Sequence, residues 1–269
     1  MREPDHSSAG QAAPPGLDLS GRPPAMDADE WAQRVELAAC YRVFARLGWT
    51  ETIYNHITVR LPGEPVRFLI NPFGLAYHEV TASNLVKIDI EGRILAPSRW
   101  PVNPAGFTLH SAVHAGVPGA HCVMHVHTTA GMAVACSADG LRLASLYAAQ
   151  LYGRVSYHDF EGITVHEEEK ARLVRNLAGR PALILRNHGL LAWGVSVPAA
   201  FFVMWTLHRA CEIQVATGAA GPRPLEIPPA VAERTARDTF REDLLPGAGR
   251  DVFASEVRRV DALDPSYRY

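Results

Sequence analysis

The sequence is poor in cysteine and lacks the cysteine spacings of common metal motifs. Its 269 residues contain four cysteines, and none belongs to a C-x-x-C pair. A disulfide framework is therefore not expected in a chain of this size, and neither is a zinc ribbon. Because each cysteine has apolar neighbours, we predict four buried thiols and a cytoplasmic location.

An excess of positive charge and a long apolar run are also missing. Lys and Arg number 26 against 28 Asp and Glu, which gives a formal net charge of -2. Such a balance gives no reason to expect binding to nucleic acid or to an anionic membrane. No stretch approaches the roughly 18 consecutive apolar residues of a membrane span. The expected partner is a small-molecule substrate.

The glycine-rich motifs that bind nucleotides are absent. Neither G-x-G-x-x-G nor G-x-x-x-x-G-K-[ST] occurs in the sequence. The first motif cradles a dinucleotide and the second the phosphates of a nucleoside triphosphate. The sequence therefore argues against both of these ligands.

Composition divides the chain into three parts. Residues 1–25 are rich in Pro, Gly, Ser and Ala and lack the apolar core of a secretory signal, so we predict a disordered tail. Residues 26–220 carry the apolar content of one sizeable domain. Prolines after Gly221 mark a linker, and residues 221–269 are predicted to form a C-terminal helical arm.

Hydrophobic periodicity and turn residues predict the elements of the domain. The predicted helices cover residues 27–47, 107–117, 130–137, 167–177, 198–215, 230–245 and 252–263. The predicted strands cover residues 52–60, 66–71, 85–90, 121–127 and 181–187, and residues 190–193 either extend the last strand or return beside it. Interspersed helices and strands indicate a layered α/β or α/β/α sandwich.

The most informative motif is His125-Val126-His127, at the end of an apolar run. Residues i and i+2 of a strand point to the same face, so the two imidazoles leave the strand end side by side. His188 ends a second apolar run. Neutral imidazole is the commonest protein ligand for transition metals, and catalytic sites often combine three protein ligands with an open position. We predict a metal site, the alternative being hydrogen-bonded histidines at the edge of a core.

Several motifs in a fixed order resemble the class II aldolase/adducin family over roughly residues 31–219. They lie at residues 54–60, 71–75, 80–86, 103–112, 125–128 and 187–191. The resemblance implies an α/β, three-layer class II aldolase-like fold, in which helices flank a central, mainly antiparallel β-sheet. It also implies a homotetramer with sites at subunit interfaces.

The same resemblance implies a metal-dependent lyase. Catalytic members of the family are similar to fuculose- or ribulose-phosphate aldolases and epimerases, whose metal polarises a substrate carbonyl or enediolate. Three histidines hold that metal, and they fall on His125, His127 and His188. Zinc is the first expectation for this chain, and Fe2+ and Mn2+ stay open.

The chain departs from the sugar-phosphate aldolases at two motifs. Their Ser-Ser-Glu segment, which supplies a base and phosphate-binding hydroxyls, is replaced by Pro104-Ala105-Gly106. Their Gly-Asn pair is replaced by Asn55-His56. Loss of a general base typically removes about 10²–10⁴-fold of rate. We therefore expect a small, non-phosphorylated oxo- or hydroxy-acid, aromatic acids included, that is cleaved by aldol chemistry or decarboxylation.

Four further residues are candidates for the remaining tasks. His56 and His110 are candidate acid–base residues, although His110 stands one helical turn before His114 and both could serve in packing. Asn55 and Arg186 are candidate substrate-binding residues. Arg186 suits a substrate carboxylate, which it could bind in bidentate fashion, but it suits a structural ion pair equally well.

Two other functions stay open at this point. The first is an Fe(II)-dependent oxidative decarboxylase of an aromatic acid, although such enzymes usually bind iron through two histidines and one carboxylate. The second is a non-catalytic, adducin-like assembly module that keeps its metal for structure.

Overall fold

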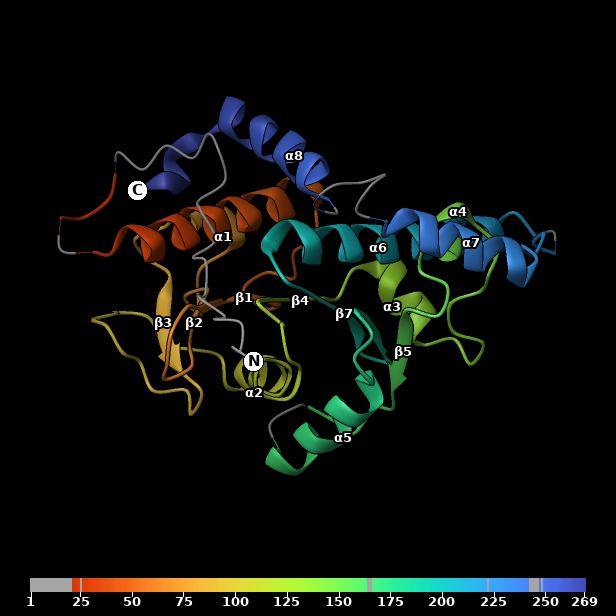
Figure 1. Ribbon diagram of the computed structural model, residues 1–269, viewed down its shortest axis with the longest axis horizontal. Helices are drawn as coiled ribbons and strands as arrows, with labels where there is room; N and C mark the ends of the chain where they lie inside the picture. The colour runs from red at the N-terminus through yellow and green to blue at the C-terminus, as the bar shows by residue number, and fades with distance from the viewer. Residues whose placement is uncertain (1–20, 25, 164–165, 222, 242–246, 248) are drawn as a thin grey trace, which may run out of the picture.

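The computed structural model describes residues 21–24, 26–163, 166–221, 223–241, 247 and 249–269. Its centre is one seven-stranded sheet with helices on both faces (Figure 1). The strands follow the order β3-β2-β1-β4-β7-β6-β5 across the sheet. All neighbours are antiparallel except β5 and β6, which are parallel. This confirms the expected α/β fold with a mainly antiparallel sheet.

The strands are short and the helices fall into two layers. The strands are β1 (His56–Leu61), β2 (Arg67–Ile70), β3 (Val86–Asp89), β4 (Cys122–Val126), β5 (Val155–His158), β6 (Ala182–Leu185) and β7 (Gly189–Gly194). The helices are α1 (Ala28–Leu47), α2 (Pro104–Gly116), α3 (Thr129–Ala135), α4 (Leu146–Gln150), α5 (Glu167–Leu177), α6 (Val197–Ala219), α7 (Pro229–Thr239) and α8 (Arg250–Leu263). Figure 1 shows α1, α6 and α8 on one side of the sheet and α2 and α5 on the other.

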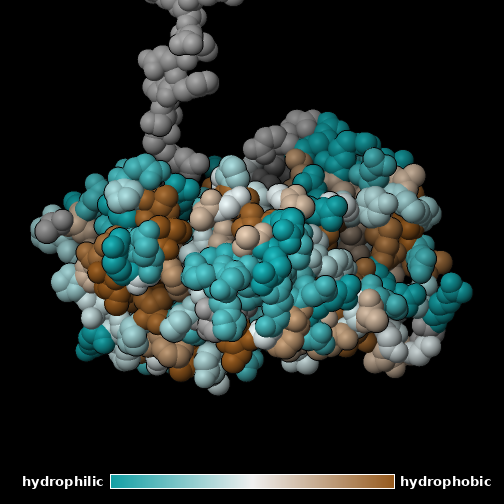
Figure 2. All heavy atoms as spheres, turned by 90° about the horizontal axis from the view of Figure 1, so that it is seen from below, coloured by the Kyte–Doolittle hydropathy of each residue, from teal (hydrophilic) through white to brown (hydrophobic). Residues whose placement is uncertain are grey.

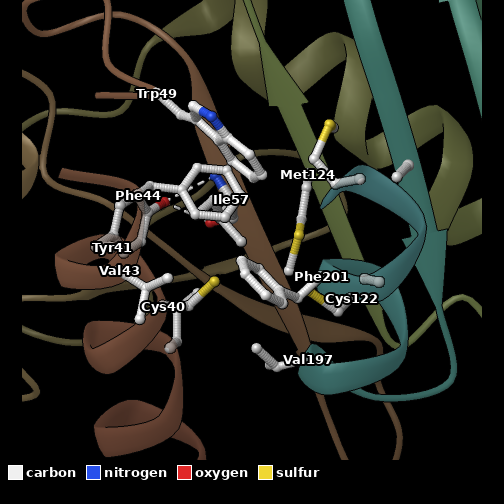
Figure 3. Close-up of a cluster of buried hydrophobic side chains, with 14 of the residues drawn as sticks. Cys40, Tyr41, Val43, Phe44, Trp49, Ile57, Cys122, Met124, Val197 and Phe201 are labelled. Atoms are coloured by element: carbon white, nitrogen blue, oxygen red, sulfur yellow. Dashed lines mark hydrogen bonds between the residues drawn. The ribbon is translucent and has the colours of Figure 1, made fainter. Parts of the chain in front are cut away.

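The two faces of β4 look toward different layers. Cys122, Met124 and Val126 pack into the large core under α1 and α6 (Figure 3). Val123 packs with apolar residues of α2 and α5 on the opposite face. Since side chains alternate along a strand, His125 shares the face of Val123. The polar end of β4 is thus directed to the side covered by α2 and α5.

The surface on the α2 and α5 side is mixed in character. Figure 2 views the molecule from that side and shows hydrophilic side chains across the middle, with apolar patches beside them. The hydrophilic residues agree with the sequence of α5, which opens with three glutamates and buries only part of its surface.

Local signals account for the ends of α1. The Asp27 carboxylate accepts hydrogen bonds from the amides of Asp29 and Glu30, which caps the first turn. Gly48, at φ +74°, closes the last turn in a left-handed conformation that glycine adopts without strain. The predicted helix over 27–47 is confirmed almost to the residue.

Some predicted elements differ from the observed ones. The first strand begins at His56 and not at Thr52, because Thr52 and Asn55 have positive φ angles that no extended strand continues. The sequence patterns missed α4 and β5, whose four or five residues are too few to show a period. The expectation of four buried thiols is wrong for Cys136, which is exposed at the end of α3.

The C-terminal segment packs against the domain. Helix α7 contacts α4, and α8 contacts α1 and α6. A short 3-10 helix, η2 (Pro265–Arg268), follows and places Tyr267 against α1 with no exposed surface. Helix α7 ends at Thr239, and residues 242–246 of the longer predicted helix lie outside the described residues. Most of the predicted N-terminal tail lies outside them as well.

No described helix combines the length and the apolar character needed to cross a bilayer. The longest apolar helix, α6, instead buries much of its surface against β7, β4 and α3.

We predict that Tyr41→Phe destabilises the fold by about 2–3 kcal/mol. The buried Tyr41 hydroxyl donates to the Ile57 carbonyl (2.5 Å) and accepts from the amides of Ile57 (2.8 Å) and Asn71 (3.2 Å). Removing it leaves buried backbone groups unpaired where β1 begins. Urea unfolding measures the loss, and Tyr152→Phe, at an exposed tyrosine, serves as the control. Equal midpoints for both variants would contradict the prediction.

Candidate metal centre

Three histidines converge at the end of the central strand β4. His125 is in β4, His127 follows the last residue of that strand, and His188 lies in the turn between β6 and β7. Because β4 and β7 are antiparallel, with Val126 opposite Leu190, this turn lies beside the end of β4. One nitrogen from each ring lies within 4.8 Å of the others. The sheet pairing thus brings together the three residues that the sequence predicted.

The ring of His125 is held in one tautomer. Its Nδ1 lies 3.0 Å from the carbonyl oxygen of Leu190, which can only accept a hydrogen bond. In the neutral ring the Nδ1–H therefore donates, and Nε2 keeps its lone pair. That Nε2 lies 2.8 Å from Nε2 of His127. Metal-binding histidines characteristically donate their other N–H in this way.

All three imidazoles are held in the neutral form that binds metal ions. Burial lowers the pKa of His125 far below its ordinary value, and the neighbouring rings of His188 and His127 lower it further. Burial also lowers the pKa of His188 to about 4. Burial lowers the pKa of His127, although the charge of Glu51 opposes the shift. Three neutral nitrogens around one point fit a divalent cation.

Gly189 allows the two strand ends to approach closely. A Cβ at this position would lie 2.5 Å from the Val126 carbonyl oxygen and 2.9 Å from the ring of His127. Any larger residue would push the turn away from β4. The glycine of the Asn-His-Gly motif therefore lets His188 come close to His125 and His127.

The histidines line a cavity of about 370 Å³ with an apolar mouth. Tyr54, Phe160 and Ile163 also line it, with 50%, 55% and 75% of their surfaces exposed. Large apolar side chains that stay this exposed beside a cavity are characteristic of binding sites. No charged residue is found among the described residues that line it.

Asn55 is one of the polar residues that line the cavity, and it is unusual in two respects. It is buried with 2% exposure, yet neither atom of its side-chain amide has a hydrogen-bond partner. Its backbone is left-handed, at φ +67°. An unpaired buried amide costs about 1–3 kcal/mol, and strained backbone is found where function maintains it. A residue that lines the cavity thus carries a buried amide donor and acceptor that are both unpaired.

His56 stands opposite His125 in the pairing of β1 with β4. The Asn103 amide nitrogen lies 3.3 Å from His56 Nε2, and Oδ1 of Asn71 lies 3.4 Å from Nδ1. The amide donates to Nε2, so the proton of the neutral ring is on Nδ1. Burial lowers the pKa of His56 to about 4. The ring is therefore a fixed, neutral part of the wall.

His110 lies behind the ring of His56 and belongs to a series of linked hydrogen bonds. Nδ1 of His114 donates to the Ala120 carbonyl (3.0 Å), so its Nε2 accepts from the Thr58 hydroxyl (2.7 Å). The Thr58 oxygen in turn accepts from Nδ1 of His110 (2.8 Å). Nε2 of His110 is then a buried lone pair without a partner. His110 is not among the described residues that line the cavity.

Arg186 is directed elsewhere. Its guanidinium donates to the Ser137 carbonyl (3.2 Å) and lies 4.7 Å from the centre of the Tyr157 ring. Asp159 is 3.7 Å away. These contacts match the ion-pair alternative considered from the sequence, and Arg186 is not among the cavity residues in the described part of the chain.

The sequence patterns did not single out Asn103, Thr58 or the apolar mouth. Thr58 is two residues after His56 and therefore shares its strand face, a relation that the predicted strand over 52–60 already contained. Asn103 immediately precedes α2, and no local pattern connects it with His56.

Comparison with known proteins identifies the family. The model of the "Class II Aldolase and Adducin N-terminal domain" matches residues 35–215. The chain belongs to the class II aldolase/adducin family.

One animal protein and two solved structures illustrate the range of the family. Rat alpha-adducin is 49% identical over 203 residues, which are 74% of this chain and 28% of that protein. An aldolase II superfamily protein from Pseudomonas syringae superimposes with a TM-score of 0.85 at 40% identity, covering 91% of this chain and 98% of that one. An L-fuculose 1-phosphate aldolase from Glaciozyma antarctica gives a TM-score of 0.80 at 28% identity, covering 93% and 98%.

We predict that Thr58→Val destabilises the protein by about 3 kcal/mol, because it leaves nitrogens of two buried imidazoles unpaired. Thr58→Ser keeps the hydroxyl and loses one methyl group, so it should cost only about 1 kcal/mol. Urea unfolding of both variants tests the chain of hydrogen bonds. Equal losses for Val and Ser would argue against it.

We predict that stability falls as the pH drops below 6.5. Burial lowers the pKa of His56 and His114 to about 4, against an ordinary value of 6.5. Between these values the unfolded chain binds protons that the folded chain does not, so each group removes about 1.4 kcal/mol per pH unit. Above pH 6.5 these groups contribute no slope. Urea unfolding with EDTA at pH 7.5, 6.0 and 5.0 checks this, and constant stability over that range would contradict it.

Proposed function

We propose that this chain is a metal-dependent carbon–carbon lyase that acts on a small, non-phosphorylated oxo- or hydroxy-acid. The observation that carries the proposal is the convergence of His125, His127 and His188 on one cavity wall. These residues would hold the ion, which when bound would stabilise negative charge on a substrate oxygen as the C–C bond breaks. The similarity to an L-fuculose 1-phosphate aldolase supports the reaction class.

Residues of the wall would orient the substrate. The amide of Asn55 offers both a donor and an acceptor, and both are unpaired before a ligand enters. His56 offers a rigid neutral surface next to His125, held by Asn71 and Asn103. Leu109 and the exposed mouth residues would exclude water from the apolar part of the substrate.

The lack of cationic lining supports a substrate without phosphate. Phosphate sites generally combine Arg or Lys with helix N-termini or backbone amides. The cavity is lined in the described chain by neutral side chains alone. The apolar mouth suits an acid with a hydrophobic or aromatic body. Whether that acid undergoes aldol cleavage or decarboxylation depends on its own functional groups.

We predict that the purified protein contains about one divalent ion per chain and that His125→Ala reduces this to below about a tenth, since one of three ligands is lost. Elemental analysis after dialysis measures the content. His78→Ala is the matched control because His78 is exposed and is not part of the cluster. Equal metal content in the His125 and His78 variants would contradict the ligand assignment.

The identity of the metal separates the lyase from the other two functions. Zinc or manganese would direct screening to cleavage of oxo-acids. Iron, with oxygen consumed on an aromatic acid, would favour oxidative decarboxylation. If the wild-type protein binds no metal even after incubation with divalent ions, a non-catalytic module is favoured, in line with the similarity to alpha-adducin.

A further inference from the structure

Gly106 and the ring of His56 compete for the same space. A Cβ built on Gly106 would lie 2.1 Å from Cδ2 of His56 and 2.3 Å from its Nε2. Real Cβ atoms essentially never approach other atoms so closely, so one of the two groups would have to move. His56 can be accommodated only because position 106 has no side chain.

The His56 ring has little freedom to retreat. It is buried with 4% exposure and is hydrogen-bonded through both nitrogens to Asn71 and Asn103. The ring of His110 lies edge-on behind it, with 5.9 Å between the ring centres. Gly106 itself is fixed in the first turns of α2. A side chain at position 106 and the His56 ring therefore exclude each other, and we treat the two residues as one unit.

This unit determines the charge of the cavity. Gly106 and His56 line the same cavity as the three histidines, so a side chain at 106 that took the place of the His56 ring would lie beside His125. With glycine at 106, the described lining contains no Asp or Glu, and the ring that fills the space is neutral. The carboxylate of Glu51 acts on His127, but it is exposed and is not among the described lining residues, so an ion on three neutral imidazoles would keep most of its positive charge. Buried charge without a partner is costly, so a ligand that supplies negative charge is favoured.

We infer that Gly106 and His56 together determine substrate specificity by keeping protein carboxylates out of the cavity. The site then selects acids that chelate the metal through a carboxylate and the adjacent oxo or hydroxyl oxygen, namely 2-oxo or 2-hydroxy acids. This inference rests on the proposed function, because it requires a metal at His125, His127 and His188.

The steric part is tested with a double-mutant cycle on the metal-free protein. Gly106→Ala in the wild type should destabilise the protein strongly or prevent folding. The same change in a His56→Ala background should be neutral or stabilising, because alanine is the better helix former and the obstructing ring is gone. A double variant that folds where the single one does not supports the coupling. An equal cost of Gly106→Ala in both backgrounds overturns it.

The electrostatic part is tested with oxalate, a dianion that chelates through adjacent carboxylates. Two variants are matched in shape and differ in charge, namely H56A/G106E and H56A/G106Q. Calorimetry on metal-loaded protein should give oxalate affinity in the Glu variant at least about tenfold weaker than in the Gln variant, a ratio equal to about 1.4 kcal/mol. Elemental analysis confirms that both carry metal.

The outcomes separate this inference from the proposed function. Equal oxalate affinities in two metal-bound variants overturn the selection of acids and leave the metal site intact. A wild-type protein that binds no metal overturns both the proposed function and the selection of acids. The double-mutant cycle on the metal-free protein still reports on the packing of His56 against Gly106.

Discussion

The site depends on the hydrogen bonding of β4 between β1 and β7. This pairing places His125 opposite His56 on one side and opposite Leu191 on the other, and it brings the turn that carries His188 to the end of β4. Because the side-chain period of a strand is two residues, a slip by one residue would move His125 into the apolar core under α1 and α6. The large residues that fill that core, Phe44 and Phe201 among them, therefore also fix the position of the histidines (Figure 3).

The buried histidines form a second level of organisation. Two carbonyl groups, of Leu190 and Ala120, orient the rings of His125 and His114. A carbonyl can only accept, so each fixes one tautomer and thereby the polarity of the bonds that follow it. The sheet thus decides which nitrogen of His125 is available at the cavity, and the segment after α2 decides which nitrogen of His114 accepts from Thr58.

Local patterns in the sequence predicted a large part of this structure, and long-range contacts account for the remainder. The His-x-His spacing was enough to predict that His125 and His127 lie side by side. The position of His188 at the end of another apolar run was enough to predict that it joins them. The direction of Arg186 could not be predicted, because it depends on the Ser137 carbonyl and the Tyr157 ring, which are distant in sequence. The start of β1 was missed because the left-handed Asn55 sits inside an apparently regular strand pattern. Strain of this kind is set by the tertiary fold and by the cavity that Asn55 lines.

The contact between Gly106 and His56 also limits how this cavity can change in evolution. A change from glycine at 106 meets the imidazole as long as His56 stays in place. A lineage that carries this pair can acquire an acidic residue at 106 only after position 56 has accepted a smaller one. The order of the two substitutions is therefore constrained, and a single substitution at 106 does not place a carboxylate in the cavity.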